Sequence, residues 1–399
     1  MSLERTENWW ISEYNFCDDV RSRYHLPKRV LFHEATLRDG EQTPGVVFRK
    51  EDKIAIAKKL DELGVDRIEA GMPAVTQEDF DAIREICQLG LKAEIFAFCR
   101  AMVSDIDKAL ECGVDGVIIE APSGLPRLLY QYRWSEDQVL EKCLTAVRYA
   151  KEKGLKVAFF PFDTTRAQLP FLKRLVTEVV EKAKPDSVAV IDTTGSALPD
   201  AIYYLVRQIK SWVDIPVEVH THNDLGMSVA TALAGVCAGA EVVHACINGL
   251  GERCGNTPLE EIVVACHALL GVETGIHYEK LTETSRFVEE CAGVKLAFNK
   301  PLVGGAHYTR ETGLGMDVMR REPKTLMAIS PEFVGNRFRM VLGKKSGKDS
   351  IEIKLDQLGK SYTEEQVSEL LQRVKKLGTE TRRFLTDEEW LALVQEVIG

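Results

Sequence analysis

The alternation of short apolar runs with amphipathic segments between residues 29 and 270 constrains the fold of this 399-residue chain most strongly. The runs are rich in Val, Ile or Phe, which is typical of parallel strands buried on both faces. Residues 52–60 place apolar side chains at helical spacing, and Gly64 stands where that helix should end. Glycines at 113, 154 and 239 have equivalent positions. The expected strands are 29–37, 66–70, 93–98, 115–120, 155–162, 186–191, 216–220 and 241–247.

Eight strands alternating with eight helices predict an α/β fold of the (β/α)8 TIM-barrel type. An open doubly wound sheet is the alternative, but it rarely needs eight regular parallel units. In a barrel, active residues cluster at the carboxyl ends of the strands. Polar groups follow that rule here, and they are Arg38, Asp39, Glu69, Asp192, Thr193, His220, His222 and the loop 248–256.

The remainder of the chain does not continue the alternation. We expect an N-terminal extension over 1–28, a catalytic barrel over 29–275 and a small mixed or helical accessory region over 276–399. Helices are predicted at 281–294, 363–377 and 386–397, and the last two open with a Thr followed by acidic residues. This region is too short for a large regulatory domain.

Composition limits the possible functions. The chain is 45% hydrophobic and 28% charged, which is ordinary for a soluble globular protein. A net charge of -10 argues against nucleic-acid or anionic-membrane partners. The absence of an apolar run of membrane-spanning length predicts no membrane-spanning helix, and we expect no targeting leader. The ten cysteines include no Cys-x-x-Cys pair, so reduced thiols in a cytoplasmic protein are expected.

Two histidines and an aspartate carry the strongest chemical signal. His220 and His222 lie two residues apart on a strand and therefore share a face. Together with Asp39 they would form a two-His-one-carboxylate metal site with open positions. The alternatives are ordinary packed histidines and an Asp39 that caps the following helix. Oxygen and imidazole ligands suit Mg²⁺, Mn²⁺, Zn²⁺ or Fe²⁺.

Neighbouring polar residues complete the expected site. Arg38 would hold an anionic oxygen, or it forms an ion pair with Glu69 or Glu34. Thr193 would donate a hydrogen bond to a substrate carboxylate, or it is a turn residue before Gly195. The glycine-spaced loop 249–256 would present backbone amides to an anion. Cys254 within it is expected to pack rather than react.

The motifs containing Arg38–Gln42, Glu69, Thr193, His220–Gly226 and Asn248–Asn256 resemble the 2-isopropylmalate, homocitrate and citramalate synthase family. That family belongs to the metal-dependent barrel superfamily that includes hydroxymethylglutaryl-CoA lyase. The resemblance covers about residues 29–350 and extends to the post-barrel segment 341–347. It implies a Claisen-type condensation in which acetyl-CoA adds to a 2-oxo acid and the thioester is then hydrolysed.

The resemblance also implies residue roles. Asp39, His220 and His222 would bind the metal with Asn223, or with Gln42 nearby, and Arg38 would stabilise charge on the oxo acid or its alkoxide. Catalytic roles are expected for Arg38, Glu69, Thr193, His307 and Tyr308. Substrate contacts are expected from Arg38, Gln42, Asp163, Arg166, Asp192, Thr193, Glu252 and Asn256.

Three positions depart from the family pattern. Phe162 stands where the synthases usually carry a Glu, and Gly315 and Leu326 stand at the positions of a His and a Tyr. The proton-transfer residues are therefore unassigned, and His307 and Tyr308 are hypothesised substitutes.

The substrate stays open at this point. Arg127 and Arg166 would read a second carboxylate, whereas Phe98, Phe160 and Phe162 favour a smaller or apolar acid. A metal-dependent carbon–carbon lyase or aldolase and a non-catalytic metal-binding paralogue are the alternatives to the synthase. An iron oxygenase with the same ligands is disfavoured by the fold. Oligomers are common in the resembling family, and a homodimer is expected.

Overall fold

The computed structural model describes residues 4–399, which divide into two compact units. One unit, residues 13–296, contains a closed barrel in which eight strands pair in chain order. All neighbouring strands are parallel, and β8 pairs with β1 to close the ring. The predicted barrel is confirmed, and the open-sheet alternative is wrong because no edge strand remains. The strands are β1 (Leu31–Glu34), β2 (Arg67–Glu69), β3 (Glu94–Arg100), β4 (Gly116–Pro122), β5 (Lys156–Phe162), β6 (Ser187–Asp192), β7 (Val217–Thr221) and β8 (Val242–Ala245).

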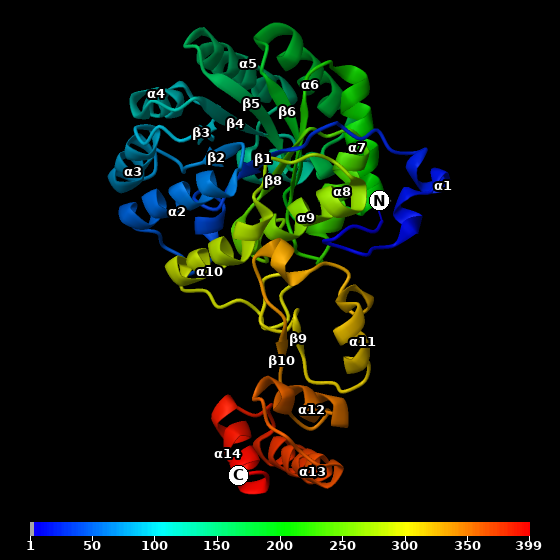
Figure 1. Cartoon of the computed structure of the whole chain (residues 1–399). Helices are drawn as coiled ribbons and strands as arrows, with labels where there is room; N and C mark the ends of the chain where they lie inside the picture. The colour runs from blue at the N-terminus through cyan, green and yellow to red at the C-terminus, as the bar shows by residue number, and fades with distance from the viewer. Residues whose placement is uncertain (1–3) are drawn as a thin grey trace. The chain divides into compact units, whose positions relative to one another are not determined.

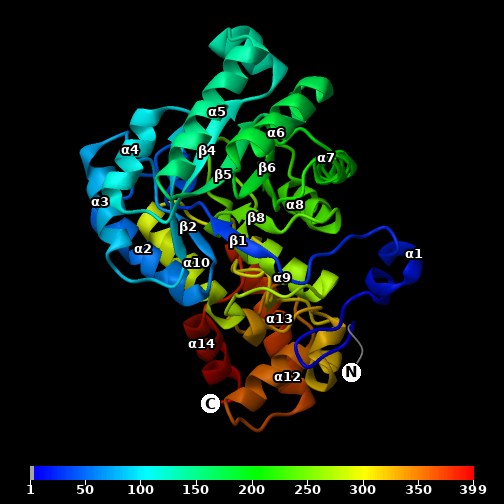
Figure 2. The same ribbon diagram turned by 90° about the horizontal axis from the view of Figure 1, so that it is seen from above.

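Helices surround the barrel, as two views show (Figures 1 and 2). One follows each strand: α2 (Lys50–Leu63), α3 (Gln77–Cys87), α4 (Val103–Cys112), α5 (Glu136–Glu152), α6 (Leu169–Ala183), α7 (Pro199–Trp212), α8 (Ser228–Cys237) and α9 (Leu259–Leu270). The unit also contains the α-helices α1 (Asp18–Arg21) and α10 (Leu281–Ala292). Short helical turns are labelled η: the π-helix η3 (Arg127–Tyr132) and the 3-10 helices η1 (Glu13–Phe16), η2 (Gly40–Gln42), η4 (Thr164–Arg166), η5 (Ile247–Gly249) and η6 (Tyr278–Lys280).

The helix α2 illustrates how sequence pattern becomes packing. Ile56, Ala57, Leu60 and Leu63 are fully buried, so the apolar side of the helix covers the barrel. The helix ends at Gly64, whose φ of 91° lies in the left-handed region. A Cβ at this position would also overlap the carbonyl of Gly275, so any other residue would be strained twice over.

The second unit comprises residues 4–12 with 297–399. Its predicted helices are confirmed as α13 (Glu364–Thr381) and α14 (Asp387–Val397), whose N-caps Thr363 and Thr386 form capping boxes. The sequence did not predict the two-stranded parallel sheet or the helix α12 (Lys348–Gln357). The remaining elements are β9 (Thr309–Arg310), β10 (Arg339–Met340), α11 (Met316–Arg321), α12 (Lys348–Gln357), η7 (Pro323–Thr325) and η8 (Pro331–Val334).

The helices of residues 4–399 include none that is both long enough and apolar enough to cross a membrane. The ten cysteines are free thiols in the structure, and most of them are buried.

Candidate metal centre and active site

The carboxyl ends of β1 and β7 bring three potential ligands together. Nε2 of His220 lies 3.1 Å from Nε2 of His222 and 3.3 Å from Oδ2 of Asp39. Nε2 of His222 lies 3.7 Å from the same carboxylate oxygen. All three side chains are buried, so the barrel wall fixes their positions.

This donor set fits one divalent ion. Ligand atoms bound at about 2.1 Å and separated by tetrahedral or octahedral angles lie about 3.0–3.4 Å apart. The separations of 3.1 and 3.3 Å fall in that range, and the third, 3.7 Å, is slightly longer. Burial lowers the pKa of His220 and lowers that of His222 to about 4, so both imidazoles are neutral as metal ligands must be. Although burial opposes it, the Arg38 guanidinium holds the pKa of Asp39 well below its usual range, so the carboxylate is ionised.

Arg38 is fixed beside this triad by Glu69. Nε of Arg38 donates to Oε1 of Glu69 at 2.7 Å, and Nη2 donates to Oε2 at 3.3 Å. Nη1 of Arg38 lies 3.3 Å from Oδ2 of Asp39, and the guanidinium stacks 4.3 Å above the ring of Phe98. Of the two predicted ion-pair partners of Arg38, Glu69 and Glu34, the structure shows the pair with Glu69. The ion pair with Glu69 does not prevent Arg38 from binding an anionic oxygen, because Glu69 holds the guanidinium group next to Asp39 of the metal triad.

Glu34 has a different environment. Its carboxylate accepts hydrogen bonds from the backbone and hydroxyl of Thr36, and from the backbone N–H of Ile247 at 3.1 Å. Burial raises its pKa to about 7. Glu34 therefore ties the end of β1 to the loop after β8.

The rim between β5 and β6 holds a separate polar group. Arg166 donates twice to the fully buried Asp163, both at 2.8 Å, and the backbone N–H of Asp163 donates to Oγ1 of Thr193 at 2.8 Å. Nε of Arg127 lies 3.7 Å from Asp163. Asp192 accepts from Thr165 and from the backbone N–H of Ser196 and Ala197, so it shapes the loop after β6. Arg166 and Asp192 are thus occupied within the protein, whereas Thr193 remains partly exposed.

Other predicted contacts lie in the loops around the triad. The backbone N–H of Glu252 donates to Oδ1 of Asp39 at 3.4 Å, while the Glu252 side chain is exposed and pairs with Arg253. Asn256 is buried and donates to the carbonyl of Leu250 at 3.1 Å. Gln42 is exposed on η2. Cys254 is also exposed, so its expected packing role is wrong.

Asn223 follows the two histidines but faces another direction. Its Oδ1 accepts from the backbone N–H of Ser228 at 3.1 Å and from the Ser228 hydroxyl at 2.9 Å. The side chain therefore caps the start of α8, and a ligand role for it stays a prediction.

Aromatic side chains line the barrel beside the triad. Phe98, Phe160 and Phe162 belong to one buried cluster, and the Phe160 ring lies 5.3 Å from that of His220. Phe162 lies at the mouth, where its ring contacts Tyr132 and the guanidinium of Arg127.

His307 and Tyr308 belong to the other unit, so the structure leaves their expected catalytic role a prediction. His307 is exposed and Tyr308 is 2% exposed. Leu326 packs in that unit against the cluster of Met316, Met319 and Met340, and Gly315 has a φ of 80°.

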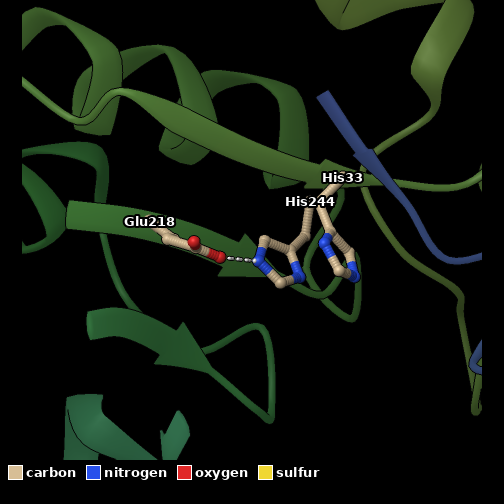
Figure 3. A group of neighbouring side chains, drawn as sticks. All are labelled: His33, Glu218 and His244. Atoms are coloured by element: carbon tan, nitrogen blue, oxygen red, sulfur yellow. Dashed lines mark hydrogen bonds and ion pairs between the residues drawn. The ribbon is translucent and has the colours of Figure 1, made fainter. Parts of the chain in front are cut away.

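A second buried polar group, not anticipated from the sequence, contains His33, Glu218 and His244 (Figure 3). Nε2 of His244 bonds Glu218 at 2.6 Å, and Arg67 donates to the same carboxylate at 2.7 Å. His33 stacks on His244 at 4.3 Å and contacts Glu69 at 3.3 Å. The sequence signal that could have identified this group is the presence of polar side chains within otherwise apolar strands.

The trio of His33, Glu218 and His244 resembles a metal cluster, since its potential ligand atoms lie within 4.8 Å of one another. However, the two imidazole planes are only 20° apart and stacked, so their nitrogen lone pairs do not converge on one point. We interpret the trio as a buried ionic network that extends to Glu69 and Arg38.

The chain is similar to known proteins over most of its length. The HMGL-like family model matches residues 29–288, and the homocitrate synthase post-HMGL domain-like model matches residues 302–382. A homocitrate synthase of Methanopyrus kandleri is 42% identical, covering 94% of both chains. An (R)-citramalate synthase of Methanocaldococcus jannaschii is 44% identical, over 93% of this chain and 75% of the relative. A 2-isopropylmalate synthase of the same organism is 41% identical, over 94% and 73%.

The fold also has solved counterparts. The HMG-CoA lyase of Bacillus subtilis superposes with a TM-score of 0.62 at 20% identity, over 69% of this chain and 97% of that one. This likeness concerns the barrel architecture alone. The family model and the relatives extend across the barrel and the post-barrel region, so the chain belongs to the HMGL-like family.

Proposed function

We propose that this protein is a divalent-metal-dependent acyltransferase that condenses acetyl-CoA with a 2-oxo acid to give a 2-hydroxy dicarboxylic or tricarboxylic acid and CoA. The observation that carries the proposal is the convergence of Asp39, His220 and His222 on one point, with Arg38 held beside it. Relatives whose names are homocitrate, citramalate and 2-isopropylmalate synthase support this reaction class.

The residues would divide the work as follows. Asp39, His220 and His222 hold Mg²⁺, Mn²⁺ or Zn²⁺, which when bound polarises the keto group of the oxo acid. Arg38 is preorganised by Glu69, so its guanidinium meets the negative charge that grows on the keto oxygen without reorganising. Thr193, at the partly exposed rim, positions the substrate carboxylate.

Within this reaction class, the oxo acid is proposed to carry a short or apolar side chain, which narrows the product to a 2-hydroxy dicarboxylic acid. Arg166 is neutralised by its two bonds to Asp163, so it offers little charge to a second carboxylate. Phe98, Phe160 and Phe162 instead present apolar rings next to the triad.

The test is the release of CoA from acetyl-CoA, read as free thiol, across pyruvate, 2-oxoisovalerate, oxaloacetate, 2-oxoglutarate and glyoxylate. Each assay is run with Mg²⁺ or Mn²⁺ and with a chelator. Chelator-sensitive release with one acid is the expected result. Metal binding without release on any acid would refute the proposal and favour a carbon–carbon lyase or a non-catalytic metal-binding protein.

Several broader features belong to the same proposal. The barrel over residues 29–275 would carry the chemistry, after an extension over 1–28 and before an accessory region over 276–399. His307 and Tyr308 of that region would supply proton-transfer groups. We also propose a cytoplasmic homodimer, for which light scattering after gel filtration is the direct measurement.

A further inference from the structure

The proposed condensation needs a base that removes a proton from the acetyl methyl group. Most acids and imidazoles near the triad already have partners within the protein. Asp39, His220 and His222 form the metal site, Glu69 is bound by Arg38 and His33, and Glu34 is bound by Thr36 and Ile247. Asp163 is bound by Arg166, and Asp192 by the loop after β6.

Glu120 is the exception. Its carboxylate has no hydrogen bond and no ion pair with any residue of the described chain, 4–399. It is nevertheless not a surface group, because its side chain is only partly exposed and it lies on β4, one of the eight strands of the closed barrel.

Strand register shows where Glu120 points. Ile118, two residues earlier on β4, packs in the interior cluster with Phe98 and Phe160, so Glu120 shares the inward face. Glu120 is paired in register with Phe160, whose ring contacts His220. The charged groups that act on it are Arg38, Asp39, Glu69 and Arg127, which surround the barrel mouth.

We propose that Glu120 is the catalytic base of this enzyme, a role that rests on the proposed condensation. A carboxylate without a partner, facing the substrate space beside Arg38, has both the lone pair and the position that proton abstraction requires. Burial raises its pKa to about 7, against the opposing charge of Arg38, which places it in the range a base needs near neutral pH.

The step balances in atoms and electrons. A carboxylate oxygen of Glu120 takes a proton from the acetyl methyl group, and the C–H electron pair forms the new bond to the keto carbon. The π electrons of the keto group move to its oxygen, next to Arg38, and this alkoxide takes up one proton from solvent. Water then cleaves the thioester, giving a carboxylate, the CoA thiol and one proton, while Glu120 releases the proton it took from the methyl group to solvent.

The decisive variant is Glu120→Gln, which keeps size and removes the base. Metal content, 2-oxo acid binding by calorimetry and the melting temperature are expected to stay near wild type. The kcat for CoA release is expected to fall by about 10²–10⁴-fold, the usual contribution of a general base. Exchange of the acetyl methyl hydrogens with deuterated water should fall in parallel.

Two further variants make the result specific. Glu94→Gln is the matched control, because Glu94 begins β3 at the opposite end of the barrel and pairs with Lys156; its kcat should be unchanged. Glu120→Ala should regain activity when formate is added, which a purely structural role would not produce.

The outcomes separate the two proposals. If wild type condenses acetyl-CoA and Glu120→Gln retains kcat within tenfold, Glu120 is not the base and the proposed function stands. A changed preference among oxo acids with unchanged kcat would equally overturn the base and make Glu120 a specificity residue. If wild type itself releases no CoA with any acid, the proposed function fails first.

Discussion

Replacing Glu69 by Gln should destabilise the barrel by about 3 kcal/mol, because Glu69 is a fully buried partner of Arg38. Burial alone would raise its pKa, but Arg38 and His33 overcome this and lower the pKa from 4.5 to about 2. At about 1.36 kcal/mol per pKa unit, that difference corresponds to about 3 kcal/mol. Loss of one partner of a buried pair typically costs about 3–5 kcal/mol, which agrees.

The assay is urea denaturation at pH 7, followed by circular dichroism, on metal-free wild type and Glu69→Gln. Metal is omitted because a ligand that binds only the folded state adds to its apparent stability. Glu94→Gln is the control, since its pair with the half-exposed Lys156 and its 3.7 Å contact with Arg67, which keeps Glu218, should together contribute less than about 1 kcal/mol. A change below about 1 kcal/mol for Glu69→Gln would refute the assigned strength of the pair.

The pH dependence of this difference has a fixed sign. The folded pKa of Glu69 is lower than its unfolded value, so its stabilisation is complete above pH 4.5. It is lost as pH falls through 4.5 toward 2, at about 1.4 kcal/mol per pH unit. The difference in the free energy of unfolding between wild type and Glu69→Gln should therefore become smaller below pH 4.5. A larger difference at those pH values would contradict the assignment of Glu69 to an ion pair.

Three other changes test separate parts of the structure. His222→Ala should abolish stoichiometric Mn²⁺ binding in calorimetry, because only Asp39 and His220 would remain; unchanged affinity would place the metal elsewhere. Glu218→Ala should cost about 3–5 kcal/mol in urea denaturation, since it removes the buried partner of Arg67 at 2.7 Å and leaves only Glu94 at 3.7 Å. Gly124→Ala should lower the melting temperature through a cost of about 1–3 kcal/mol, because a Cβ would overlap the Asp163 carboxylate and displace Arg166; an unchanged melting curve would show that this rim can yield.

The sequence predicted most of the fold because strand period, helix period and terminating glycines agree along 29–270. It also identified Arg38, Asp39, His220 and His222, since each follows an apolar strand. The helix α12 was missed because Lys348–Gln357 has a weak apolar pattern, and β9 and β10 are each two residues long. Such elements are defined by tertiary pairing rather than by local period.

The barrel interior was harder to predict. His33, Glu218 and His244 come from three strands, and only the closed ring brings them together. Glu120 is a similar case, since nothing local in the sequence distinguishes an inward carboxylate without a partner from one held in an ion pair. The choice between Glu69 and Glu34 as the partner of Arg38 is made by the tertiary structure, because both lie near the ends of neighbouring strands.

The contrast between Glu69 and Glu120 follows from the way charges are paired in this barrel. Arg67, Glu218 and His244 form the deep end of an ionic network that continues through His33 to Glu69 and Arg38. A network of that kind holds Arg38 in one orientation, but its members are too strongly paired to exchange protons with a substrate. A carboxylate that is not held in an ion pair is freer to accept a proton, and keeping such a group mostly out of water costs stability. A carboxylate retained under that cost at the barrel mouth is explained by function rather than by packing, which is the physical reason for placing Glu120 in the reaction.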